Sequence, residues 1–126
     1  MGSTKQVLLV EDEATLRSII VRNLAARGHT VAEADCARDA LARLSESRPD
    51  LMLLDINLPD RSGWDILREM RSRGWDVPVV IISAVRVSPA RLEEFRPLAF
   101  LPKPFPLEAL LRVVEDARPK KGELVR

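Results

Sequence analysis

The chain has one cysteine, one histidine and no tyrosine among its 126 residues. A lone cysteine, Cys36, excludes a disulfide within the chain and fits a reducing compartment such as the cytoplasm. With a single histidine there is no cluster of His and Cys side chains to hold zinc. That histidine, His29, follows Gly28 in a predicted loop, so we interpret it as a surface residue.

Long hydrophobic runs and an excess of either charge are missing as well. The longest apolar stretch, residues 77–85, is interrupted and far too short to cross a bilayer, and the polar residues 1–6 do not resemble a signal peptide. Twenty Lys and Arg against nineteen Asp and Glu give a formal net charge of +1. We therefore expect a cytoplasmic protein without membrane insertion, whose domain does not bind nucleic acid directly.

The remaining composition, 46% hydrophobic and 31% charged residues, is that of an ordinary globular protein. The length suits one domain with a single core, which we place at residues 5–118. Residues 119–126 lack a hydrophobic face and predict a disordered tail or the start of a linker.

Five apolar runs alternate with five segments of helical periodicity. The predicted strands are residues 5–10, 30–34, 51–54, 77–82 and 98–101. This alternation predicts an α/β fold, a doubly wound parallel sheet with helices on both faces. The fourth helix is expected to be short or irregular, because Ser88-Pro89 begins it and Pro97 leaves room for only about two turns.

The third strand is the most informative stretch. Residues 51–54 are four consecutive large apolar residues, which indicates a strand buried on both faces. The strand is followed at once by Asp55, and then by the turn residues Pro59 and Gly63. Asp55 therefore lies at the carboxyl edge of the sheet, where ligands bind in open α/β folds.

Polar side chains follow the other strands at the same edge: Glu11 and Asp12, Ser83, and Lys103. Three carboxylates in one pocket repel each other, and the pKa of one rises unless a cation neutralises them. Mg²⁺ suits such a set of oxygen ligands. With Ser83 and Lys103 beside it, the pocket fits the oxygens of a transferring phosphoryl group, and Asp55 is the candidate nucleophile that forms an acyl phosphate.

Each residue taken singly also has a simpler interpretation. The acids at 11–13 can cap the first helix, and Asp55 can form an Asx turn. Ser83 can be a strand-end hydroxyl bonded to backbone, and Lys103 a solvated surface charge. Because packing does not require complementary groups at the ends of four strands, we favour the functional interpretation of the set.

The chain resembles the receiver domain of response regulators in two-component signalling, across residues 5–118. Four motifs carry the resemblance: VLLVEDE at 7–13, LLDINLPDRSG at 53–63, VVIISA at 79–84 and LPKPF at 101–105. The resemblance implies a flavodoxin-like strand order, 2-1-3-4-5. It also implies that Asp55 accepts a phosphoryl group from a histidine kinase or a histidine phosphotransfer protein.

By position, the resemblance implies roles for the neighbours of Asp55. Mg²⁺ would be held by Asp55, by Asp12 directly, by Glu11 mainly through water and by the backbone carbonyl of Asn57. Ser83 and Lys103 would bind the phosphoryl oxygens. Three further expectations are a small neighbour at Ala84, a switch aromatic at Phe100 and a cis bond between Lys103 and Pro104.

The resemblance further implies a downstream effector domain or protein, and a dimer that forms on phosphorylation. It implies no enzyme activity beyond self-catalysed phosphotransfer and autodephosphorylation. The segment 88–97 departs from the family pattern, which has a longer fourth helix. The family's usual output surface, which includes the fourth helix, is therefore not carried over to this chain.

Three alternatives remain open. A phosphatase of the haloacid-dehalogenase type also begins with an aspartate after a buried strand, but it needs a second acid where this chain has Asn57. A flavodoxin-like binding module needs a phosphate-cradling loop where this chain has the acids 11–13. A degenerate receiver that docks without phosphorylation is disfavoured by the intact set of residues.

Overall fold

The computed structural model describes residues 4–117, which form five strands and five helices in strict alternation. The strands are β1 (Gln6–Val10), β2 (Thr30–Ala34), β3 (Leu51–Asp55), β4 (Val79–Ser83) and β5 (Ala99–Pro102). The helices are α1 (Ala14–Ala26), α2 (Ala37–Glu46), α3 (Gly63–Arg73), α4 (Pro89–Phe95) and α5 (Leu107–Asp116).

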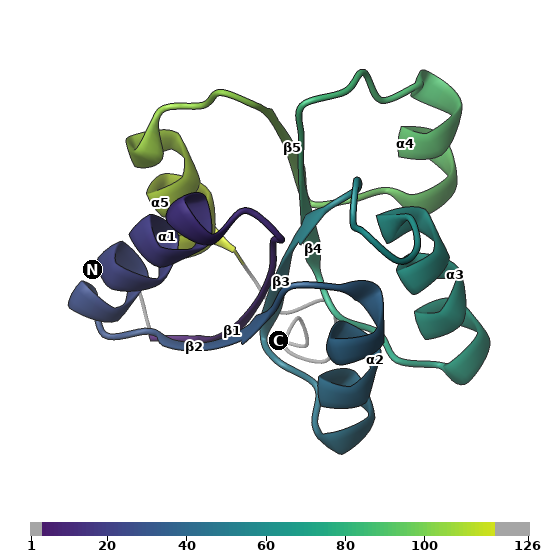
Figure 1. Cartoon of the computed structure of the whole chain (residues 1–126), viewed down its shortest axis with the longest axis horizontal. Helices are drawn as coiled ribbons and strands as arrows, with labels where there is room; N and C mark the ends of the chain where they lie inside the picture. The colour runs from purple at the N-terminus through teal and green to yellow at the C-terminus, as the bar shows by residue number, and fades with distance from the viewer. Residues whose placement is uncertain (1–3, 118–126) are drawn as a thin grey trace, which may run out of the picture.

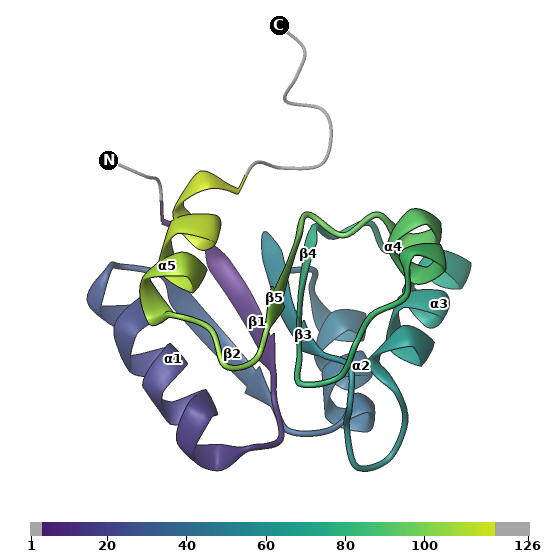
Figure 2. The same cartoon turned by 90° about the horizontal axis from the view of Figure 1, so that it is seen from above.

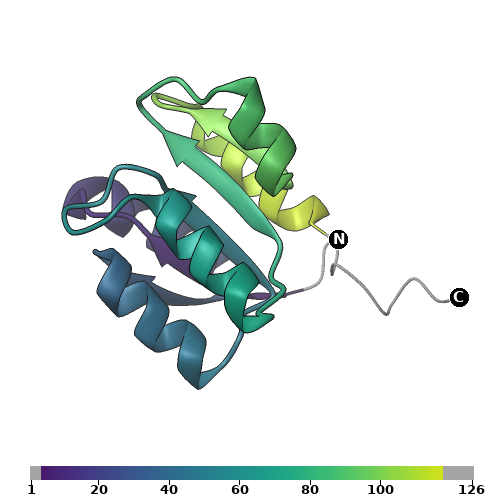
Figure 3. The ribbon, with the colours of Figure 1, turned by 90° about the vertical axis from the view of Figure 1, so that its right-hand side faces the viewer.

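All four strand pairings are parallel, and the strand order is β2-β1-β3-β4-β5. The arrowheads in Figure 3 accordingly point toward one end of the sheet. Helices α1 and α5 cover one face, and α2, α3 and α4 cover the other (Figure 1). This confirms the predicted doubly wound α/β fold and the strand order that the resemblance implied.

The sheet divides the core into two halves, one under each helix layer. Strands β3 and β4 are buried at every position, because helices cover both of their faces. The edge strands β2 and β5 keep partly exposed positions. The uninterrupted apolar run at residues 51–54 thus marks the centre of the sheet.

Several element ends follow local sequence signals. Gly74 ends α3 in the left-handed conformation, with φ of 72°. Ser88 caps α4 through a hydrogen bond from the Arg91 N–H, and Pro89 occupies the first helical turn. Strand β4 begins at Val79, two residues later than predicted, because Pro78 has no N–H to donate to the ladder.

The prediction that His29 is a surface residue is wrong. Its ring is buried and links the residue before β1 to α5. Nδ1 accepts a hydrogen bond from the Lys5 N–H at 3.0 Å, and Nε2 lies 3.0 Å from the Glu115 carboxylate at the end of α5. The hydrogen bond from His29 lowers the pKa of Glu115. Local sequence could not reveal this contact, because Glu115 lies 86 residues away.

Helix α4 is short, as predicted, and contains no buried residue. Figure 2 shows it beside α3 at the outside of the domain. Its main contact is Phe95, whose ring stacks on Trp64 of α3 with centroids 5.4 Å apart and planes at 19°. Arg71 of α3 adds a hydrogen bond to the Glu94 carbonyl at 2.8 Å and lies over the Phe95 ring. An aromatic and guanidinium cluster therefore holds α4 on the domain.

We expect Phe95→Ala to loosen α4 selectively. Amide hydrogen exchange in residues 89–95 should accelerate strongly while β4 stays protected, because only the α4 contact is lost. The free energy of unfolding should fall by about 1 to 2 kcal/mol, less than for a fully buried phenylalanine. Exchange mass spectrometry checks this. Leu98→Ala, at a side chain that is already exposed, is the control and should leave α4 exchange unchanged. Equal exchange in Phe95→Ala and the wild type would contradict the prediction.

Two further sequence predictions concern the C-terminal tail and membrane insertion. The tail predicted at residues 119–126 lies outside the described residues. Among residues 4–117, none of the helices is long and apolar enough to cross a bilayer.

Candidate functional site

The register of β1 and β3 places two acids side by side. Val10 pairs with Leu54, so Glu11, directly after β1, lies level with Asp55, the last residue of β3. Both are buried, and the Glu11 N–H is bonded to the Ala34 carbonyl of β2 at 3.0 Å. Two carboxylates therefore meet at the carboxyl edge of the sheet.

The register of β4 and β5 brings a hydroxyl and an ammonium to the same edge. Ser83 pairs with Pro102, and the Lys103 N–H donates to the Ser83 carbonyl at 2.8 Å. The Lys103–Pro104 peptide bond is cis, as expected. The ends of four neighbouring strands thus converge, as the sequence predicted.

Lys103 is the cation of this pocket. Its Nζ donates to Asp55 Oδ2 at 3.0 Å and to Glu11 Oε2 at 3.2 Å, and its side chain is only 17% exposed. Burial alone would lower the pKa of Lys103, but the hydrogen bonds to Asp55 and Glu11 outweigh it and raise that pKa. The simpler interpretation of Lys103 as a solvated surface charge is therefore wrong.

Glu11 is the most enclosed acid of the site. Its residue is fully buried, and burial, with a further contribution from the charge of Asp55, raises its pKa. Its Oε2 accepts from the Glu13 N–H at 3.1 Å. Its Oε1 lies 3.1 Å from Lys103 Nζ but has no hydrogen-bond partner of good geometry among the described residues. This leaves a buried oxygen able to accept a further partner.

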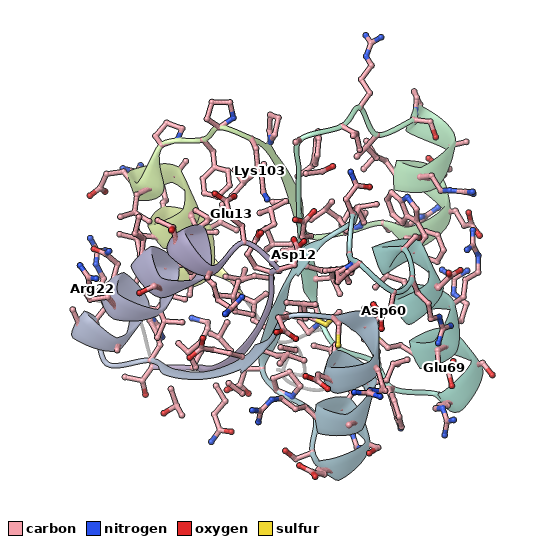
Figure 4. All side chains as sticks on the ribbon, viewed as in Figure 1. Asp12, Glu13, Arg22, Asp60, Glu69 and Lys103 are labelled. Atoms are coloured by element: carbon pink, nitrogen blue, oxygen red, sulfur yellow. The ribbon has the colours of Figure 1, made fainter. Side chains whose placement is uncertain are left out.

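The acids do not serve as a helix cap. Glu13 is the N-cap residue of α1, but its side chain makes no capping hydrogen bond. One oxygen from each of Glu11, Asp12 and Asp55 lies within 4.8 Å of the other two. Asp12 is exposed, and Figure 4 shows it with Lys103 between the two helix layers, whereas Arg22 and Glu69 lie at the outer sides. The donor set consists of oxygens and includes an unpartnered buried one, so it fits Mg²⁺.

Only some of the residues predicted to surround Asp55 contact it in the structure. The Asn57 N–H donates to Asp55 Oδ1 at 3.1 Å, which is the Asx turn of the simpler interpretation of Asp55. The role of the Asn57 carbonyl as a metal ligand stays a prediction. The Ser83 hydroxyl, although buried, is bonded to the N–H and carbonyl of Val85, both at 3.1 Å. In this conformation Ser83 has the backbone partner of the simpler interpretation. Ala84 is exposed, and Phe100 packs against the core half under α2, α3 and α4.

Arg17 is a site residue that the sequence analysis missed. Its Nη1 donates to the Glu11 carbonyl at 2.8 Å, and its Nε to Glu33 of β2 at 3.2 Å. It therefore fixes the backbone of the acidic loop from α1. Its partners lie after β1 and in β2, so they could not be read from the residues around Arg17 in the sequence.

Gly63 lets the loop after β3 close tightly. Its N–H donates to the Ile56 carbonyl at 2.7 Å. A Cβ atom at this position would lie 2.8 Å from the Asp55 carbonyl oxygen and 2.9 Å from the Ile56 Cα, which are both backbone atoms. Any larger residue at 63 must therefore displace the backbone that carries Asp55.

We expect Gly63→Ala to destabilise the protein by about 2 kcal/mol, as overpacking against backbone does. Its amide NMR shifts should change at residues 55–57. Gly74→Ala is the matched control: it is strained by the positive φ, but a Cβ there meets no atom within 4 Å. It should lose stability without any change at residues 55–57. Unchanged spectra at those residues in Gly63→Ala would contradict the prediction.

The comparisons with known proteins identify the family and agree with the fold. The sequence model of one protein family, the response regulator receiver domain, matches residues 7–115. The chain belongs to this family. Among curated relatives of the receiver, the two-component response regulator PhoP of Pseudomonas aeruginosa is 43% identical over 79 residues, covering 63% of this chain and 35% of PhoP. The response regulator MprA of Mycolicibacterium vanbaalenii is 34% identical over 108 residues, which cover 84% of this chain and 47% of MprA.

Solved structures resemble the receiver over nearly its whole length. The chemotaxis response regulator CheY4 of Vibrio cholerae is 26% identical, with a TM-score of 0.80 and coverage of 89% of this chain and 97% of that one. The response regulator TrrA of Thermotoga maritima, solved in complex with Mg²⁺ and BeF, is 25% identical, with a TM-score of 0.77 and coverage of 88% and 96%. The receiver spans about half or less of the length of the curated relatives named above.

Proposed function

We propose that this receiver takes a phosphoryl group onto Asp55 from a histidine kinase or a histidine phosphotransfer protein, and that the modification controls an output partner. The observation that carries the proposal is the buried pair Asp55 and Glu11 bridged by Lys103, beside the exposed acid Asp12. An ammonium held 3.0 Å from the acceptor carboxylate is placed to neutralise phosphoryl oxygens.

In the proposed reaction an Asp55 oxygen attacks the phosphorus of a phosphohistidine. A new O–P bond forms, the N–P bond breaks, and the imidazole nitrogen keeps the electron pair. Lys103 then shares its ammonium between Glu11 and the phosphoryl oxygens. Mg²⁺, held by Asp12, Asp55, the Asn57 carbonyl and Glu11 through water, would supply charge neutralisation for the phosphoryl oxygens. The receiver thus catalyses its own phosphorylation and dephosphorylation and is otherwise not an enzyme.

Ser83 supports a conformational response. Its hydroxyl must release Val85 before it can bond a phosphoryl oxygen on Asp55, and Val85 belongs to the loop that leads to α4. Phosphorylation would therefore favour a second arrangement of this loop, in which Phe100 takes the inward position. The relatives named as response regulators support a kinase as input and an effector as output. We also propose a cytoplasmic location and a phosphorylation-dependent dimer as one form of response.

The test is incubation with acetyl phosphate and Mg²⁺, followed by intact mass spectrometry. We expect one phosphoryl adduct per chain, which hydroxylamine removes because an acyl phosphate reacts with it. Beryllofluoride with Mg²⁺ should bind in competition with the phosphodonor. The proposal would be contradicted if neither acetyl phosphate nor any of a range of phosphorylated kinases produced an adduct.

A further inference from the structure

Asp60 connects the loop after β3 to a different element. It lies in the β3–α3 connection, and Figure 4 shows it on the side of α2 and α3. Its Oδ1 accepts from the Ala37 N–H at 2.8 Å, and its Oδ2 from the Arg38 N–H at 2.9 Å. Both bonds are to the first turn of α2, whose own N-cap, Cys36, offers only a sulfur at 3.5 Å. Asp60 therefore supplies a cap that α2 lacks.

The end of β2, three residues before α2 begins, contacts the other half of the site. The Glu11 N–H is bonded to the Ala34 carbonyl at 3.0 Å. The segment Ala34–Arg38 is thus joined on one side to the loop that carries Glu11 and Asp12, and on the other side to the β3–α3 loop, which follows Asp55 and carries Asn57. Together with Asp55 at the end of β3, these two loops carry the oxygens that fit Mg²⁺.

Within the β3–α3 loop, Asp60 holds the outer part. The base is closed by the Gly63 N–H bond to the Ile56 carbonyl and by an antiparallel bridge between Asn57 and Ser62. Residues 58–61 lie outside that closure, and the Asp60 carboxylate ties them to α2. The backbone hydrogen bonds, that from Ala37 first, also lower the pKa of Asp60, so the carboxylate is charged at neutral pH.

We propose that Asp60 is a positioning residue, which fixes the β3–α3 loop against the start of α2 and thereby sets the Mg²⁺ affinity of the receiver. The inference rests on the proposed function, because it places Mg²⁺ between the two loops. Mg²⁺ is small and demands nearly ideal octahedral geometry, so its binding is sensitive to small displacements of a ligand-bearing loop. In this proposal Asp60 is not a ligand: its carboxylate accepts hydrogen bonds from the backbone N–H groups of Ala37, Arg38 and Arg61.

The test is Mg²⁺ titration of the wild type and Asp60→Ala by isothermal calorimetry, with urea unfolding measured in parallel. The Kd for Mg²⁺ should rise about tenfold, the low end of the loss found for groups that orient metal ligands. Asp50→Ala is the matched control. Asp50 also accepts a backbone N–H, from Gln6 at 2.8 Å, but it joins β1 and β3 at the opposite end of the sheet. It should lose stability with an unchanged Kd.

Acid pH provides a second readout of the same bonds. Because the folded-state pKa of Asp60 is depressed below 3.8, the stability it contributes is present above 3.8 and is lost as the pH falls through the folded-state pKa. The difference in unfolding free energy between the wild type and Asp60→Ala should therefore shrink in acid. Asp60→Asn, which keeps one acceptor oxygen, should show a smaller rise in Kd and decides the question if Asp60→Ala does not fold.

The outcomes separate the two proposals. If the wild type binds Mg²⁺ and Asp60→Ala or Asp60→Asn binds it with the same Kd, the positioning role is wrong while the phosphoacceptor function stands. If Asp50→Ala weakens Mg²⁺ binding as much as Asp60→Ala, the effect is general destabilisation and the positioning role is also wrong. If the wild type does not bind Mg²⁺, the metal site of the proposed function fails, and this inference fails with it.

Discussion

Asp55→Asn should abolish phosphorylation of the receiver by acetyl phosphate. The substitution keeps the shape of the side chain but removes the anionic oxygen that would attack phosphorus. We expect the rate to fall by roughly three orders of magnitude or more, as for the loss of a catalytic nucleophile. Intact mass spectrometry measures the adduct directly. Lys103 keeps its ion pair with Glu11 in the variant, so the fold should survive.

A second acidic cluster supplies the control for this prediction. Asp35, Cys36 and Asp39 also place ligand atoms within 4.8 Å of one another, but the charge-compensating Lys103 is bonded to Glu11 and Asp55 instead. Asp39→Asn is the same chemical change in that cluster and should leave phosphorylation at the wild-type level. If Asp55→Asn is phosphorylated like the wild type, or if Asp39→Asn alone loses the adduct, Asp55 is not the acceptor.

Lys103→Met should produce the largest loss of stability in the site. It leaves Glu11 and Asp55, both buried, facing each other without the ammonium that now lies 3.0 Å from Asp55. Removing one charged partner from a buried ionic cluster typically destabilises a protein. We expect the free energy of unfolding to fall by about 3 kcal/mol at pH 7 without Mg²⁺. Urea unfolding measures it. Added Mg²⁺ should recover part of the loss, because a divalent ion replaces the missing positive charge.

The loss in Lys103→Met should depend on pH with a definite sign. The pKa of Glu11 is already raised above 4.5, through burial first and then the charge of Asp55, so Glu11 holds its proton more tightly in the folded protein than in the unfolded chain. The stability linked to that proton is present below 4.5 and is lost as the pH rises through the folded-state pKa. Removing Lys103 raises that pKa further. The difference between Lys103→Met and the wild type should therefore be larger at pH 8 than at pH 5.

A double variant tests the cause of that destabilisation. Glu11→Gln combined with Lys103→Met removes the buried repulsion together with the cation, and it should be more stable than Lys103→Met alone. If Lys103→Met is as stable as the wild type at both pH values, the ionic cluster does not contribute as described. If the double variant is no more stable than the single one, the loss comes from packing of the lysine stem and not from charge.

The strands and their polar ends were predictable because their signals are local. The apolar run at residues 51–54 has no polar side chain to place in solvent, which requires a strand covered on both faces. Gly74 and Ser88-Pro89 mark helix ends through backbone conformation and capping, which depend on neighbouring residues only. Since parallel strands share one carboxyl edge, the sequence also determined that Asp55 and Lys103 meet there.

The tertiary structure decided which partner each polar group has. It buries Glu11 and exposes Asp12, although the two are adjacent in sequence. It ties Asp60 to a helix that begins 23 residues earlier, and it pairs His29 with Glu115 across 86 residues. These contacts depend on how the helix layers and loops pack against the sheet. Periodicity and turn chemistry describe only neighbours along the chain, so they carry no information about such partners.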